Sequence, residues 1–136
     1  MDLREAVRRA SMEVDGLEEA REEAILHSWG NVRGCKEAEA EMRSGSLEEA
    51  RIRLRDMLRE AESFLSRYSG KPVYFSTVYP ILSVALQELV EEVLLLSVRG
   101  GEPLPGHEEL GIPAKEYLLG LCDLVGELRR DFQEEI

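Results

Sequence analysis

The chain has 136 residues, of which 43% are hydrophobic and 33% are charged, and its formal net charge is −11. This composition is typical of one globular domain and excludes a disordered chain. The negative charge argues against a simple basic surface for phosphate groups.

The acidic excess is uneven along the chain. Residues 1–60 carry 15 acidic and 11 basic groups, whereas residues 61–136 carry 13 acidic and 6 basic groups. We therefore expect a phosphate contact in the first half and a divalent cation, which prefers carboxylate oxygens, in the second half.

Cysteine usage and hydropathy favour a cytoplasmic protein. The two cysteines, Cys35 and Cys122, lack CxxC spacing, and the two histidines add no zinc pattern. Charged residues follow Met1 at once, unlike a signal peptide. The most apolar stretch, 81–98, is interrupted by glutamates, so we expect no membrane span and no membrane partner.

Helix signals dominate the first half of the chain. Residues 3–43 are rich in Glu, Arg and Ala, which predicts one long helix or two helices with a break near Gly16. A second helix follows, because Ser46 and Glu49 have the spacing of a capping box. Gly70 is expected to end this helix.

The second half predicts two further main helices. Residues 73–78 are the only β-like run, and we expect them to form a short extended link or a first helical turn. A buried helix is expected to follow over 79–98. A connection with a short helical turn at 108–110 leads to a last helix, which starts at Pro113 and runs to about residue 134. We therefore predict an all-α single domain, 1–136, with about four main helices.

The first acidic cluster lies in the apolar third helix. Glu88 and Glu91 are three residues apart and share a helix face, where like charges repel. A bound Mg²⁺ or Mn²⁺ would relieve this repulsion. Alternatively, Gln87, Glu88, Glu91 and Glu92 form a thin stripe that faces solvent.

The second acidic cluster lies in the last helix. Asp123 and Glu127 are four residues apart on one face. Gly120 and Gly126 are costly inside a helix and indicate close approach to another helix or to a ligand. The alternative is an ordinary amphipathic helix with an acidic outer face.

Together, the two clusters could form a four-carboxylate metal site suited to phosphodiester cleavage. Segments 86–91 and 117–130 resemble the two signatures of the translin/TRAX family, and segments 46–50 and 109–112 are also similar to it. The resemblance covers about residues 20–131 and points to an archaeal TRAX-like protein.

This resemblance implies a curved antiparallel helical bundle that assembles into hollow homo-oligomers. It also implies binding of single-stranded DNA or RNA, or, in TRAX-type members, a Mg²⁺-dependent endoribonuclease. The catalytic residues would be Glu88, Glu91, Asp123 and Glu127, with Mg²⁺ or Mn²⁺ held by the first three. Family members usually continue with two or three helices after the second signature, and we expect this chain to lack them.

Nucleic-acid contacts are expected on the first helix. Arg21, Arg33 and Lys36 are the candidate RNA-binding residues, with solvated charges that balance the glutamates as the alternative. Trp29 could stack on a base or pack into a neighbouring subunit. The leading hypothesis is an endoribonuclease acting on single-stranded or short duplex RNA. Its rivals are a non-catalytic binding oligomer and a helical assembly protein without a nucleic-acid role.

Overall fold

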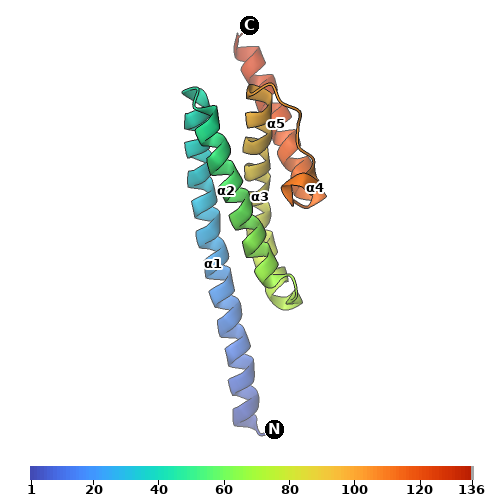
Figure 1. Ribbon diagram of the computed structural model, residues 1–136. Helices are drawn as coiled ribbons and strands as arrows, with labels where there is room; N and C mark the ends of the chain where they lie inside the picture. Colours follow the sequence, from blue (N-terminus) through green and yellow to red (C-terminus); the bar gives the residue numbers. More distant parts are fainter. Residues whose placement is uncertain (136) are drawn as a thin grey trace.

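The computed structural model describes residues 1–135, which form five helices (Figure 1). The helices are α1 (Leu3–Arg43), α2 (Leu47–Tyr68), α3 (Pro72–Arg99), the single turn α4 (His107–Leu110) and α5 (Ala114–Glu135). No strand occurs among these residues, so the predicted all-α class with four main helices is confirmed. None of the helices described is long and apolar enough to cross a membrane.

Helix α2 runs antiparallel to α1. An ion pair joins Arg53, early in α2, to Glu41 near the end of α1. Arg67, in the last turn of α2, instead pairs with Glu23 in the middle of α1, at an N–O distance of 3.1 Å. The contact positions therefore run in opposite directions along the two helices, as expected for helices joined by a short turn.

Helices α1, α3 and α5 run parallel to one another. Along α1 and α3, Asn31 donates to the carbonyl of Ala85 at 3.0 Å, and eight residues later Glu39 is hydrogen-bonded to Glu92. The connection after α3 folds back along the bundle before α5 begins (Figure 1). This return places both acidic clusters at the same level of the bundle.

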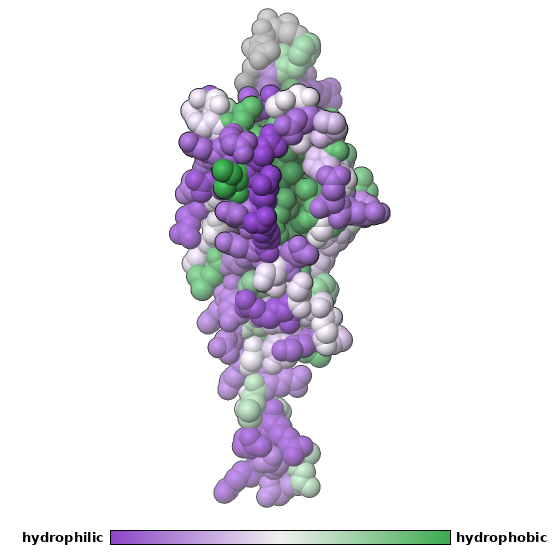
Figure 2. Space-filling model, in the orientation of Figure 1, coloured by the Kyte–Doolittle hydropathy of each residue, from purple (hydrophilic) through white to green (hydrophobic). Residues whose placement is uncertain are grey.

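Helix α1 is a single helix without a break at Gly16, and its N-terminal part projects beyond the other helices (Figure 1). The surface of this projection is mainly hydrophilic in the view of Figure 2. At Gly16 itself, a Cβ would lie 2.4 Å from the hydroxyl of Tyr74. The glycine therefore allows the α2–α3 corner to approach α1 and does not interrupt it.

Of the two alternatives for 73–78, the structure confirms the helical one, because this segment is the start of α3. Pro72 occupies the first turn, where a missing N–H costs nothing. Phe75, Val78 and Leu82 then follow at helical spacing, with Val78 and Leu82 buried against α1 and α2. Packing of this stripe outweighs the β preference of the run. Pro80 lies inside the helix, on its exposed side.

The capping box expected at Ser46 and Glu49 is not formed, because the Ser46 side chain makes no capping hydrogen bond to α2. Helix α2 nevertheless starts at Leu47, where its apolar stripe begins to face α1 and α3. Burial of that stripe defines the helix more strongly than its cap does.

Two hydrophobic clusters form the core. The smaller one joins α1, α2 and the start of α3 around Phe64, Tyr68 and Val78. The larger one joins α1, α2, α3 and α5 around α3, and it includes Leu54, Leu86, Leu89, Leu94, Ile112 and Leu124. Helix α3 is thus the central helix of the bundle, as its apolar composition predicts.

Candidate functional site

The acidic residues of α3 are buried or half-buried. Only 3% of the surface of Glu92 is exposed, and Glu88, Glu91 and Gln87 are half-buried. The alternative of a solvent-facing stripe is therefore wrong for Glu92, whereas Gln87, Glu88 and Glu91 keep part of their surface exposed. Keeping carboxyl groups at such positions costs free energy unless protons, cations or hydrogen bonds compensate them.

A close approach at Gly120 brings α5 against this part of α3. A Cβ at Gly120 would lie 2.7 Å from the carbonyl oxygen of Gln87 and 2.7 Å from a methyl group of Val90. No side chain fits there, so the prediction of a close approach is confirmed at this glycine. At Gly126 the nearest atom would be 3.7 Å away, at the end of Arg130, so no other helix approaches this glycine closely.

Glu91 of α3 meets the two acids of α5. The pKa of Glu91 is raised to about 8, first by burial and second by a hydrogen bond with the Glu127 carboxyl group. The charges of Asp123 and Glu39 act in the same direction. A hydrogen bond between two carboxyl groups requires a proton on one of them, because ionised carboxylates only accept.

Glu92 forms a second carboxyl pair of this kind, between α3 and α1. Its pKa is raised to about 10, first by burial and second by a hydrogen bond with Glu39, which is half-buried on α1. The neighbours with the largest effects on the pKa of Glu91 and of Glu92 are all carboxyl groups. Five acids from three helices therefore converge: Glu39, Glu91, Glu92, Asp123 and Glu127. Below we call this set the acid cluster.

The sequence analysis did not assign Glu39 and Glu92 to the site. Glu92 stands beside Glu91 in an apolar run, a signal that could have marked it as buried. Glu39 is one of many acids on α1, and no feature of the sequence distinguishes it from the solvated ones. Its membership depends on the register between α1 and α3.

Glu88 lies one turn before the acid cluster, at the seam between α1 and α3. Burial raises its pKa, and the charge of Lys36 opposes this effect. The nearby thiol of Cys35 is buried, and its pKa is raised to about 12 by burial and then by the charges of Glu92 and Glu88. The cysteine therefore stays a thiol at neutral pH.

The structure places the three predicted basic residues at different distances from these acids. Arg21, Arg33 and Lys36 are all exposed on α1. Lys36 acts on the pKa of Glu88 and so lies beside the site. Arg21 is 15 residues earlier, about 22 Å along the helix axis at 1.5 Å per residue, and does not belong to the same group.

The carboxyl groups do not yet form a closed set of metal ligands. Among residues 1–135, no three His, Cys, Asp or Glu side chains are arranged so that they could hold a metal ion. The donor chemistry nevertheless fits a hard cation, and the buried Oε2 of Glu92 has no hydrogen-bond partner.

A fully buried acid, Glu116, lies one turn before Gly120 on α5. Its Oε1 accepts a hydrogen bond from the hydroxyl group of Ser83 at 2.9 Å, whereas its Oε2 has no partner. Burial and the neighbouring Glu116 raise the pKa of Tyr79. This group links α3 and α5 below the acid cluster and is separate from it.

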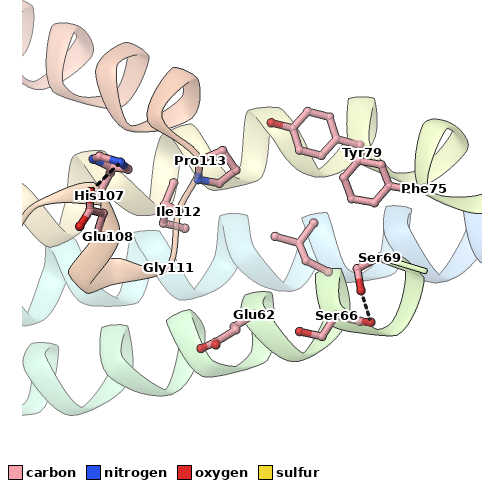
Figure 3. A pocket seen from close by; sticks show the side chains of 11 residues that line it. Glu62, Ser66, Ser69, Phe75, Tyr79, His107, Glu108, Gly111, Ile112 and Pro113 are labelled. Atoms are coloured by element: carbon pink, nitrogen blue, oxygen red, sulfur yellow. Dashed lines mark hydrogen bonds and ion pairs between the residues drawn. The ribbon is translucent and has the colours of Figure 1, made fainter. Parts of the chain in front are cut away.

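A hollow of about 410 Å³ lies at the other side of the bundle, and no member of the acid cluster lines it. Figure 3 shows Phe75 and Tyr79 of α3 opposite Glu62 and Ser66 of α2, with His107 near its rim. Its floor is mainly apolar, and it has no carboxyl pair of the kind seen in the acid cluster.

Comparison with known proteins identifies the fold. No model of a protein family matches the chain. The crystal structure of apo-NeC3PO is similar to it over 95% of this chain and 67% of that one, with a TM-score of 0.77 and 25% sequence identity. The chain therefore has the translin-type helical fold.

One curated relative also matches part of the chain. An uncharacterised protein of Methanocaldococcus jannaschii is 41% identical over 54 residues, which are 39% of this chain. The match spans only 24% of the length of that relative.

Proposed function

We propose that this chain is a TRAX-like, nucleic-acid-handling protein that binds a divalent cation at the acid cluster and cleaves RNA. The observation that carries the proposal is the convergence of five carboxyl groups from α1, α3 and α5, next to the exposed Lys36. The structural likeness to NeC3PO supports a nucleic-acid-related role, and the resemblance of residues 86–91 and 117–130 to the two translin/TRAX signatures favours the catalytic form of that role.

The acid cluster carries a free-energy cost that a cation would remove. At neutral pH, Glu91 and Glu92 must each keep a proton or place a charge beside other carboxylates. Ion pairs with arginine compensate other acids of the bundle, such as Glu41 with Arg53. Mg²⁺ and Mn²⁺ are hard cations that take carboxylate oxygens, and Mg²⁺ is typically held by one or two carboxylates together with phosphate oxygens.

The members of the acid cluster would have different roles. Asp123 is exposed and Glu91 and Glu127 are half-buried, so these three can reach a cation and a phosphate from solvent. Glu92 is almost fully buried and pairs with Glu39, so these two would add negative charge beside Glu91 without contacting the substrate. A divalent cation at this place would polarise the phosphate and lower the pKa of water. Lys36, beside Glu88, would bind an adjacent phosphate group.

A cleavage assay tests this proposal. The wild type should cleave single-stranded RNA with Mg²⁺ but not with EDTA, and Glu91→Gln should lower the rate by about tenfold to 100-fold or more. Glu22→Gln, at an exposed position of α1 remote from the acid cluster, is the matched control and should cleave normally. Equal cleavage by the wild type and Glu91→Gln would exclude the acid cluster as the site.

A second candidate function is non-catalytic binding of single strands. It is favoured by the open arrangement of the carboxyl groups, since no three of them among the described residues form a ligand set. Binding that weakens with salt, persists in Glu91→Gln and leads to no cleavage would select this function.

Both candidates include assembly into a homo-oligomer. Leu118, Val125 and Phe132 are 58%, 58% and 64% exposed on the outer face of α5, at seven-residue spacing. An apolar stripe of this kind is costly in water and typical of helix–helix interfaces. We expect native mass spectrometry to show more than one subunit, and Val125→Glu to shift the distribution toward the monomer.

A further inference from the structure

A groove runs along the seam between α1 and α3 and ends at Glu88. Its walls are Trp29 and Val32 on α1 and Val84 on α3, with Ile81 and Ala85 at the seam itself. Its volume is about 210 Å³. Apolar cavities of about 150 Å³ accept a benzene ring, so this groove has the size of a single aromatic ring system.

Trp29 makes this groove unusual for a free surface. Trp29 is 62% exposed, and Val84 on the opposite wall is 58% exposed. Tryptophan offers the largest aromatic face of any side chain, and exposing it together with further apolar side chains is costly in water. A flat, ring-shaped ligand would cover both walls at once.

The groove leads toward the acid cluster and ends one helical turn before it, at Glu88. Helices α1 and α3 are parallel, so successive turns along the seam lead from Trp29 and Val84 to Glu88, then to Glu91. Each turn advances about 5 Å. Lys36 lies at the Glu88 level and supplies a positive charge there. A strand whose base occupied the groove would thus have its neighbouring phosphates beside Lys36 and the acid cluster.

We infer that the groove is a subsite for one unpaired nucleobase of a single-stranded RNA, which stacks on Trp29 and positions the next phosphate at the acid cluster. This inference rests on the proposed function and assigns Trp29 as the residue that positions the RNA substrate. Because every base has a stacking face, the subsite would accept all four bases.

The end of the groove favours a nucleobase over a helix from a second copy. Glu88 lines the groove, and an apolar helix packed there would have to desolvate its carboxyl group. A nucleobase carries ring and amino N–H groups that can donate to a carboxylate, as in contacts of Glu or Asp with cytosine. The polar end of the groove therefore matches the polar edge of a base.

The single tryptophan of the chain provides a direct test. In EDTA, where no cleavage occurs, a short oligoadenylate should quench the fluorescence of Trp29 to saturation. A strand of the same length with abasic sites should not quench it. Trp29→Ala should raise the Kd for labelled oligoadenylate, measured by anisotropy, roughly five- to 150-fold. Trp29→Phe should restore part of the affinity.

Leu26→Ala is the matched control, because Leu26 is equally exposed on α1 but does not line this groove. Its affinity should equal that of the wild type, and circular dichroism should show that all variants are folded. Unchanged affinity in Trp29→Ala, or equal quenching by the abasic strand, would overturn the inference.

The outcome can be separated from that of the proposed function. Mg²⁺-dependent cleavage without quenching would refute the groove and leave the nuclease standing. Quenching without cleavage would refute the nuclease and leave a base-binding groove. A red shift of the Trp29 emission on dilution without RNA would show that a second copy covers the groove, which contradicts the inference.

Discussion

Replacing Glu92 by Gln should stabilise the metal-free protein at neutral pH and have little effect in acid. Glu92 is 3% exposed and hydrogen-bonded to Glu39, with a pKa raised to about 10. A glutamine has nearly the same shape, needs no proton, and its amide group can donate to the Glu39 carboxylate.

The magnitude follows from the difference in protonation between the folded and unfolded states. At pH 7.5 an unfolded glutamate is ionised, whereas folded Glu92 keeps its proton. Holding that proton about three pH units above the ordinary pKa costs about 4 kcal/mol at 1.36 kcal/mol per unit. Because the charge of the neighbouring Glu91 contributes to the raised pKa of Glu92, the cost is shared within the acid cluster, and we expect Glu92→Gln to recover about half, or ~2 kcal/mol.

The sign of the pH dependence is determined by the raised pKa. Below about pH 4.5, Glu92 is neutral in both states and carries no penalty. As the pH rises from there toward 10, the unfolded state gains by releasing its proton, so the wild type loses stability relative to Glu92→Gln. The advantage of the variant should therefore grow steadily over this range.

Urea unfolding followed by circular dichroism, in EDTA and at constant protein concentration, measures this difference. Exposed Glu22→Gln is the control and should change the free energy of unfolding by less than about 0.5 kcal/mol. If Glu92→Gln were less stable than the wild type at pH 7.5, or its advantage did not vary between pH 5 and 8, the coupled-acid interpretation would be refuted.

Three further predictions concern packing and cation binding. Gly120→Ala should lower the free energy of unfolding by about 1–3 kcal/mol, because its Cβ has no room against α3. Gly126→Ala should raise the free energy of unfolding by about 0.5–1 kcal/mol, because its Cβ meets no other helix. Thermal melts that ranked the two variants in the opposite order would contradict the helix register. Asn31→Ala should lower the free energy of unfolding by about 1–3 kcal/mol, because it removes a buried hydrogen bond between α1 and α3. A change below about 0.5 kcal/mol in urea unfolding would show that this hydrogen bond contributes little. Mn²⁺ at about 100 times its Kd should stabilise the wild type by ~2.7 kcal/mol and stabilise Glu91→Gln much less. Equal gains in melting temperature for the two proteins would show that the ion binds outside the acid cluster.

The elements of the fold could be predicted because they depend on local patterns. The helix boundaries near Arg43, Gly70 and Gly100 follow from glycines and from the limits of apolar stripes. The sequence left 73–78 undecided between an extended link and a helical turn, because the local preference of its β-branched residues opposes the burial of Val78 against α1 and α2, which makes the segment helical. Local preference differs by fractions of a kcal/mol per residue, whereas burying a large apolar side chain contributes about 1.5–3 kcal/mol.

The candidate site was only partly predictable. Glu88, Glu91, Asp123 and Glu127 stand out in the sequence because their spacing places them in pairs on helix faces. Glu39 joins them only because α1 and α3 are parallel and in one particular register. Spacing within a helix is visible in the sequence, but the register between two helices is determined by packing of the whole core.

By itself, the sequence determined that this protein is all-helical, that α3 is its buried helix, and that both α3 and α5 carry acids at one-turn spacing. Only the tertiary structure decided that these acids converge with one acid of α1, Glu39, and that Trp29 lies on the same seam as Glu88. The reason is that helix periodicity is a property of neighbours in the chain, whereas the pKa of a carboxyl group depends on groups brought near it, such as Glu127 near Glu91, that are far away in sequence.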